Sequence, residues 1–92
     1  MEFEWDPSKA AENRRKHGVS FNEAASVFGD SLGATASDPD HSADEHRHIT
    51  VGVSSSGRLL MVAHLDRDDR IRIISARKLT RSERKAYEEA QG

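Results

Sequence analysis

Three apolar runs in the second half of the chain constrain its fold more than any other feature. They cover residues 48–53 (HITVGV), 58–65 (RLLMVAHL) and 70–76 (RIRIISA), and each is rich in the β-branched and large aliphatic residues that favour strands. Only the segments SSSG and DRDD separate them, and connections this short join neighbouring strands. The sequence therefore predicts an antiparallel, three-stranded meander.

The first half predicts a short strand followed by two helices. Residues 2–5 (EFEW) alternate polar and apolar side chains, which is the period of a half-buried strand. A helix is expected to begin at Asp6 and Pro7, which suit the N-cap and the first helical position, and to end at Gly18. Residues 20–28 (SFNEAASVF) begin with a capping box and carry apolar residues at helical spacing, so they predict a second helix facing the core.

The end of the chain predicts one more helix. Thr80 and Glu83 form a capping box, and the short basic helix that follows carries Tyr87. Because 92 residues can close only one modest core, we expect a single domain over residues 1–92. The fold class is α+β, with a small, curved, mainly antiparallel sheet, two N-terminal helices and a short C-terminal helix.

Composition excludes several classes of protein. The chain has no cysteine, so neither a disulfide framework nor a thiolate metal site is expected. No apolar run approaches the roughly 20 residues that cross a bilayer, and no signal core is visible, so we expect a cytoplasmic protein without membrane contact. Residues 58–85 carry nine Arg or Lys against four Asp or Glu, a net charge of +5, and this half is the candidate surface for a polyanion.

The predicted register of the meander sorts its side chains onto two faces. A tight turn at Ser56 and Gly57 would pair Val53 with Leu60 and, further along the strands, Ile49 with His64. One face would then hold an apolar middle with polar residues towards its ends, namely Glu45, Arg47, His64, Ser75 and Arg77. The opposite face would carry arginines over small residues, a combination that can cradle a phosphate; its members are His46, His48, Thr50, Gly52, Met61, Ala63, Arg70 and Arg72.

Each candidate for chemistry also has an ordinary structural explanation. His64 ends the most apolar run, and an imidazole can move protons near neutral pH, but a core histidine with a satisfied hydrogen bond is equally natural there. The arginines at 47, 67, 72 and 77 can hold a phosphate, or can form a solvated basic face. The stripe of Lys9, Asn13, Lys16 and His17 on the first helix fits either a solvated face or contact with phosphate or a partner.

Several motifs in this order resemble the BrnT family of toxins from type II toxin–antitoxin systems. The segments that carry the resemblance are FEWDPSKAAENRRKHGVSFNEAASVF, DPDHS, EHR, VG and RIRIISARKLTRSERKAYE. They cover nearly the whole chain, and within them W-D-x-x-K, K-H-G-x-x-F, E-x-R, I-S-A-R and E-R-x-x-Y are the specific patterns. The matching positions are Asp6, Lys9, Asn13, Lys16, His17, Gly18, Phe21, Asp38, Glu45, Arg47, Gly52, Ser75, Arg77, Glu83 and Tyr87.

The resemblance implies a fold like that of the RelE-type ribonucleases and RNA cleavage that needs no metal or other cofactor and arrests translation. It also implies a cognate antitoxin that neutralises the toxin and brings the complex to promoter DNA. Cleavage of this kind requires proton transfer and neutralisation of charge on the phosphate. We assign proton transfer to Glu45 or His64 and phosphate binding to Arg47, Arg72 and Arg77; Lys9, Lys16, Arg67 and Tyr87 are the candidate RNA-binding residues.

Two other functions compete with this one. A non-catalytic module could bind the antitoxin and act as a co-repressor on nucleic acid. A metal-binding domain could be built around HSADEHRH, where His41, His46 and His48 lie close in sequence. A turn separates His41 from the other two, however, and their spacing matches no zinc pattern, so no metal ligands are assigned.

Overall fold

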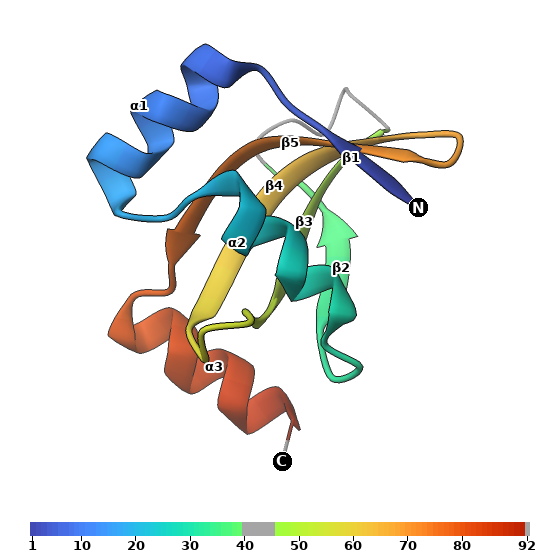
Figure 1. Cartoon of the computed structure of the whole chain (residues 1–92). Helices are drawn as coiled ribbons and strands as arrows, with labels where there is room; N and C mark the ends of the chain where they lie inside the picture. The colour runs from blue at the N-terminus through green and yellow to red at the C-terminus, as the bar shows by residue number, and fades with distance from the viewer. Residues whose placement is uncertain (40–45, 92) are drawn as a thin grey trace.

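A computed structural model describes residues 1–39 and 46–91, and they form an α+β domain in which helices pack on a five-stranded sheet (Figure 1). The elements in chain order are β1 (Glu2–Glu4), α1 (Pro7–His17), α2 (Phe21–Ser26), the 3-10 helix η1 (Val27–Gly29), β2 (Ala34–Ser37), β3 (Arg47–Val53), β4 (Leu59–Arg67), β5 (Arg70–Lys78) and α3 (Arg81–Gln91).

The predicted meander is confirmed, because β3, β4 and β5 are antiparallel neighbours. The sheet order is β1-β5-β4-β3-β2, with β2 antiparallel to β3 at one edge. At the other edge β1 runs parallel to β5, so the sheet is mixed. The C-terminal helix is not short, since α3 has 11 residues, as many as α1.

Helices α1 and α2 begin at the residues that the sequence predicted, and α1 also ends as predicted, whereas α2 ends at Ser26 and is followed by the 3-10 helix η1. The Asp6 side chain accepts from the backbone N–H of Ser8 at 2.7 Å, and Gly18 ends α1 with a φ of 67°. The hydroxyl of Ser20 accepts from the N–H of Glu23 at 3.1 Å at the start of α2. These contacts satisfy backbone groups that a helix end leaves unpaired.

The predicted register of β3 against β4 is wrong by one residue. Val53 pairs with Leu59 rather than Leu60, and His64 pairs with His48. The cause is the turn: the N–H of Gly57 donates to the carbonyl of Ser54, and Gly57 adopts a φ of 81°, so the loop is one residue longer than the tight turn expected. A slip of one residue exchanges the two faces of a strand, and Arg47 therefore lies opposite the face of His64.

A β-bulge in β5 changes the faces a second time. His64 pairs with Ile73, as the expected turn at residues 68–69 requires, but Ala63 pairs with Ser75. Ile74 is the extra residue, and it moves Ser75 and Arg77 away from the face of Ile73. One surface of the sheet, which we call the open face, therefore holds Arg47, Ile49, Met61, Ala63, Ser75 and Arg77 together.

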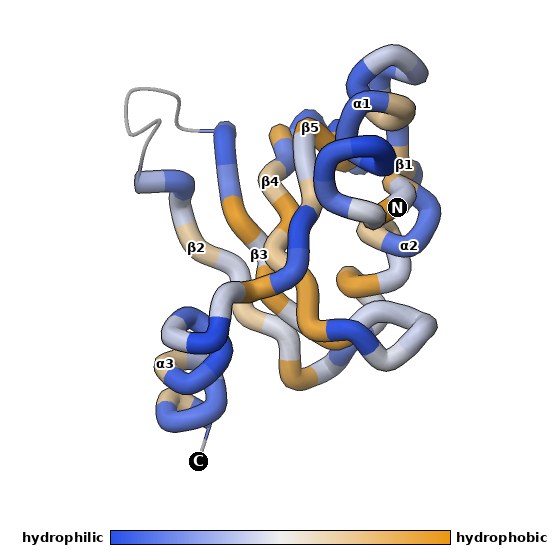
Figure 2. Tube along the Cα trace, turned by 90° about the vertical axis from the view of Figure 1, so that its left-hand side faces the viewer, coloured by the Kyte–Doolittle hydropathy of each residue, from blue (hydrophilic) through white to orange (hydrophobic). Residues whose placement is uncertain are grey.

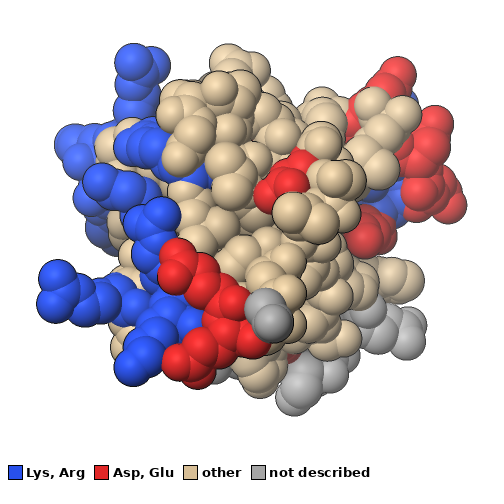
Figure 3. All heavy atoms as spheres, turned by 90° about the horizontal axis from the view of Figure 1, so that it is seen from below, with Lys and Arg blue, Asp and Glu red and all other residues tan. Residues whose placement is uncertain are grey.

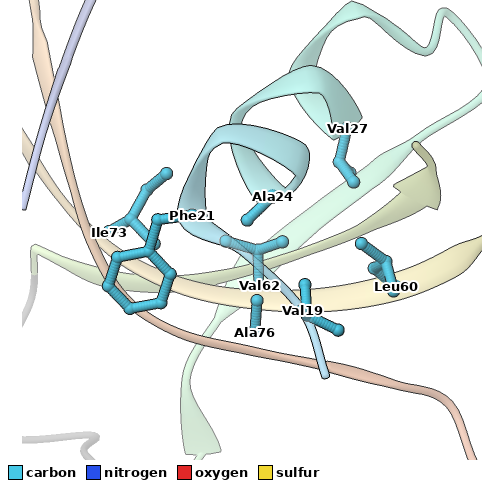
Figure 4. Close-up of a cluster of buried hydrophobic side chains, with 8 residues drawn as sticks. All are labelled: Val19, Phe21, Ala24, Val27, Leu60, Val62, Ile73 and Ala76. Carbon is cyan, nitrogen blue, oxygen red and sulfur yellow. The ribbon is translucent and has the colours of Figure 1, made fainter. Parts of the chain in front are cut away.

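The hydrophobic core lies between the other surface of the sheet and the helices α2 and η1. Figure 4 shows Phe21, Ala24 and Val27 directed at the sheet, where Leu60 and Val62 point towards them. The same core includes Val19, Ile73 and Ala76, all at most 1% exposed. In Figure 2, α1 and α2 lie on one side of the sheet and α3 lies on the other.

A buried asparagine ties α1 to β5. The side-chain amide of Asn13 donates to the carbonyls of Val19 and Ala76 at 3.0 and 2.9 Å, and its oxygen accepts from the N–H of Ala76 at 3.0 Å. Asn13 is only 5% exposed, so these bonds lie out of water. They hold the polar helix α1, which buries no other residue, against a strand 63 positions away in sequence.

Replacing Asn13 with alanine is expected to lower the free energy of unfolding by about 2 to 4 kcal/mol, because it leaves three buried backbone groups without partners. Chemical denaturation measures the change. Glu12→Ala is the matched control, since Glu12 is exposed on the preceding position and forms only a 3.7 Å ion pair with Lys16. Equal stability of the two variants would show that the Asn13 bonds do not hold α1 in place.

Candidate functional site

The open face of the sheet is hollowed by a depression of about 330 Å³. Its floor is made of the small or apolar side chains of Ile49, Met61, Ala63 and Ser75 from three neighbouring strands. Charged and polar groups form the walls, and they include His17, Asp38, Arg47 and Arg77. A shallow floor between two guanidinium groups suits an anion that must come close to the backbone.

A second hollow of about 170 Å³ continues the first between α1 and β5. His17 and Ser75 line both hollows, so the two hollows adjoin at these residues. The second hollow adds Lys9, Glu12 and Lys16 of α1. We call the two hollows together the basic groove; its lining residues are Lys9, Glu12, Asn13, Lys16, His17, Asp38, Arg47, Ile49, Met61, Ala63, Ile74, Ser75, Ala76 and Arg77.

A buried carboxylate holds Arg47 in the wall of the groove. The Nε of Arg47 lies 3.1 Å from a carboxylate oxygen of Asp38, which is 4% exposed. The backbone of the two residues is joined as well, since the N–H of Asp38 donates to the carbonyl of Arg47. Because Nε makes this bond, the terminal nitrogens of the guanidinium group keep donors for a bound anion.

Arg77 is held from α3 by a two-pronged ion pair. Its Nη1 and Nη2 donate to the two carboxylate oxygens of Glu83 at 2.7 and 2.9 Å. Glu83 also accepts from the N–H of Thr80, which completes the capping box predicted at the start of α3. The hydrogen bonds from Arg77 and Thr80 lower the pKa of Glu83 from 4.5 to about 2, and the same pair raises the pKa of Arg77.

His64 lies on the core side of the sheet and does not line the groove. It is 1% exposed, its Nδ1 is 2.7 Å from Asp66, and its Nε2 is 2.8 Å from the hydroxyl of Thr50. A carboxylate only accepts, so Nδ1–H donates to Asp66 and Nε2 accepts from Thr50. The ring packs edge-on against Phe28, and burial lowers its pKa. These are the contacts of the core histidine that the sequence left open as an alternative.

The other sequence-predicted residues divide between the groove and its surroundings. Lys9 and Lys16 line the groove, whereas Arg67 ends β4 in an exposed position and Arg72 lines neither hollow. Tyr87 on α3 donates its hydroxyl to the carbonyl of Leu32 at 2.9 Å. Glu45 falls outside the described residues.

Within residues 1–39 and 46–91, no group of three or more His, Cys, Asp or Glu side chains is placed to hold a metal ion. His48 stacks on His64 with ring centroids 5.9 Å apart, and its Nδ1 donates to the carbonyl of His46. His41 falls outside the described residues. None of the described helices is both long and apolar enough to cross a membrane.

Sequence reasoning assigned no chemical role to Asp38 and Ser75, and it gave His17 only a possible contact with phosphate or a partner. Ser75 shares a face with Arg47 and Arg77 as predicted, but the bulge, which the sequence RIRIISA does not indicate, separates it from His64 and Ile73. Asp38 lies in an acidic turn-rich stretch that resembles a solvated loop, and only the fold brings it to Arg47. His17 had a visible signal, since it follows Lys16 on the basic stripe of α1.

Basic side chains are concentrated on one side of the molecule. Figure 3 shows Lys and Arg gathered at the left of that view, on the side where α1 and β5 end and α3 begins in Figure 1. Acidic side chains in the same view lie in the middle and at the right. This separation of charge explains how a chain of net charge −2 presents a surface suited to a polyanion.

Comparisons with known proteins identify the family of the chain and a related fold. The model of a family described as the ribonuclease toxin BrnT of a type II toxin–antitoxin system matches residues 5–83. The chain therefore belongs to the BrnT family of ribonuclease toxins, and membership of a type II family implies an antitoxin partner. A search of curated protein sequences found no match.

The fold resembles that of a solved ribonuclease toxin, BrnT from Brucella abortus, whose crystal structure was determined at 1.1 Å resolution. The TM-score is 0.69 at 18% sequence identity, and the match covers 88% of this chain and 99% of the other. At this identity the likeness concerns the fold.

Because Glu83 is paired with Arg77, the pKa of Glu83 should depend on that arginine. Its pKa of about 2 means that the pair stabilises the folded state fully above pH 4.5 and that this contribution is lost as the pH falls towards 2. Arg77→Ala is expected to return the Glu83 pKa towards 4.5, as measured by NMR of the carboxyl carbon. Arg84→Ala is the control, because Arg84 pairs with Glu88 instead; an unchanged Glu83 pKa in Arg77→Ala would refute the assigned cause.

Proposed function

We propose that this chain is a metal-independent endoribonuclease with a RelE-like fold that cleaves RNA in the cytoplasm and arrests translation until a cognate antitoxin neutralises it. The observation that carries the proposal is the basic groove, in which two anchored guanidinium groups stand over a floor of small side chains. Family membership supports the ribonuclease activity, and the groove supplies a place for a phosphate.

The proposed reaction is attack by a ribose 2′-hydroxyl on the adjacent phosphorus. The phosphate gains negative charge as the new bond forms, and a preorganised guanidinium lowers the energy of that state. Arg47 and Arg77 are the candidates, because both line the hollow and are held by Asp38 and Glu83 before substrate arrives. The guanidinium groups do not give up protons, so proton transfer requires other residues.

The remaining candidates keep narrower roles. Lys9 and Lys16 extend the groove along α1 and are proposed to bind flanking phosphates. Glu45 stays the proposed proton acceptor on the sequence alone, through the E-x-R pattern with Arg47. His64 is left out of the proposed site, because it is buried on the other side of the sheet. Arg67, Arg72 and Tyr87 are proposed as contacts for RNA beyond the groove.

The antitoxin is proposed to cover the basic groove and to bring the complex to its promoter DNA. Acidic residues on the antitoxin would compete with RNA phosphates for Arg47 and Arg77. The second candidate function, a non-catalytic co-repressor, uses the same surface without turnover. Cleavage of RNA by the purified chain would distinguish the ribonuclease from the co-repressor.

The purified chain is expected to cleave single-stranded RNA in the presence of EDTA, leaving a 2′,3′-cyclic phosphate and a 5′-hydroxyl. A DNA strand of the same sequence should survive, because it has no 2′-hydroxyl. Gel electrophoresis and mass spectrometry of the products give the result. Intact RNA after incubation with folded protein would favour the co-repressor, and cleavage that stops with EDTA would contradict metal independence.

Arg77→Ala is expected to lower the cleavage rate about 10²- to 10³-fold, by analogy with the loss of one group that stabilises transition-state charge. Arg77→Lys should retain part of the activity, because lysine keeps the positive charge but cannot form the two parallel hydrogen bonds of a guanidinium group. Arg84→Ala on α3 is the control, since Arg84 lines neither hollow of the groove. Circular dichroism confirms folding, and full activity in both Arg77 variants would remove this arginine from the proposed site.

A further inference from the structure

We propose that His17 is the proton donor to the leaving 5′-oxygen in the basic groove. The proposal rests on the proposed ribonuclease function and adds a catalytic residue to it. Three observations carry it: the place of His17 at the junction of the two hollows, the contacts that fix the end of α1, and the chemistry of the other groups in the groove.

His17 is directed into the groove by its spacing from Asn13. Residues four positions apart lie on the same face of a helix, so the face of α1 that carries Asn13 to β5 also carries His17 to it. Asn13 is bonded to the backbone of Ala76, and the strand residues on either side of Ala76 are Ser75 and Arg77. His17 therefore stands beside the two open-face residues, at the point where both hollows meet.

The backbone immediately after His17 is held in place. Gly18 adopts a left-handed conformation with a φ of 67°, and its N–H donates to the carbonyl of Arg14 at 2.9 Å. Its own carbonyl accepts from Arg58 at 3.0 Å, and Arg58 in turn forms an ion pair with Glu23. The side chain of His17 is exposed to solvent while its backbone is fixed, which suits a group that must meet a substrate.

The other charged groups of the groove cannot easily donate a proton at neutral pH. They are Lys9, Glu12, Lys16, Asp38, Arg47 and Arg77. Arginine and lysine are by nature far weaker acids than imidazolium, and a carboxyl group serves more readily as a proton acceptor than as a donor near neutral pH. A carboxylate can accept the 2′-hydroxyl proton, and an imidazolium is the group best suited to give a proton to the leaving oxygen near neutral pH.

The histidines outside the groove do not compete for this role. His64 and His48 stack on each other on the core side, where Asp66 and Thr50 occupy the ring nitrogens of His64. His46 precedes β3, and its carbonyl accepts from the backbone N–H of Asp66. Among the described residues, His17 is thus the imidazole that lines the groove.

The proposed reaction is a transesterification. The 2′-oxygen gives its proton to a carboxylate or water and forms a bond to phosphorus, and the bond from phosphorus to the 5′-oxygen breaks. The electron pair of that bond stays on the 5′-oxygen, which takes the proton of the His17 imidazolium. The products are a 2′,3′-cyclic phosphate and a 5′-hydroxyl, and neutral His17 recovers a proton from water.

The test compares two RNA substrates of one sequence, one of which has sulfur in place of the bridging 5′-oxygen at the cleavage site. A thiolate leaves without protonation, because thiols are much more acidic than alcohols. His17→Ala is expected to slow cleavage of ordinary RNA about 10²-fold or more and to cleave the sulfur-containing RNA at nearly the wild-type rate. His17→Gln should behave in the same way, which guards against an effect of lost packing.

Arg15→Ala is the matched control, because Arg15 is exposed in the same last turn of α1 and lines neither hollow. It should cleave both substrates at the wild-type rate. An equal loss on both substrates in the folded His17 variants would overturn the donor role, and so would undiminished cleavage of ordinary RNA. Wild-type protein that cleaves neither substrate would overturn the proposed function itself, and the role of His17 with it.

Discussion

The three hydrogen bonds of the buried Asn13 amide are the interaction on which the basic groove depends. Helix α1 is mostly polar and packs only Ala10 against the core, so the bonds from Asn13 to Ala76 and Val19 are its main buried polar attachment to the rest of the domain. A buried amide has a strong preference for one geometry, because each unpaired donor or acceptor is costly. The same contact that completes the fold therefore positions Lys16 and His17 over the sheet.

The arginines of the groove show how a small domain organises charge without a deep pocket. Each is fixed by a carboxylate from another part of the chain, Arg47 by the buried Asp38 just after β2 and Arg77 by Glu83 on α3. A guanidinium that is already oriented loses less conformational freedom when an anion binds. The carboxylates also neutralise part of the charge, so the groove combines orientation with a moderate positive potential.

The C-terminal helix has a double role in this arrangement. It buries none of its residues, and it is joined to the rest of the domain through Glu83, Tyr87 and Gln91. The hydrogen bonds between Glu83 and Arg77 anchor that arginine in the groove, so the placement of α3 and the orientation of Arg77 are coupled. A partner that moved α3 would also change the proposed phosphate site.

Local sequence patterns determined the secondary structure of this protein. The caps at Asp6, Ser20 and Thr80 and the apolar runs act through neighbouring residues, and the helices and the meander appear where those patterns predict them. Lys9, Lys16, Arg47 and Arg77 could also be selected from the sequence, because their charge and spacing are visible there.

Only the tertiary structure decided that His64 lies apart from Arg47 and Arg77 and that α1 brings Lys16 and His17 to the sheet. The left-handed Gly57 and the extra residue Ile74 each shift a strand by one position, and a one-residue shift moves every following side chain to the other face. Those two shifts separated His64 from the arginines and placed Ser75 and Arg77 beside His17. Strand register depends on how a turn closes and on packing across the sheet, and the local pattern of residues determines neither of these.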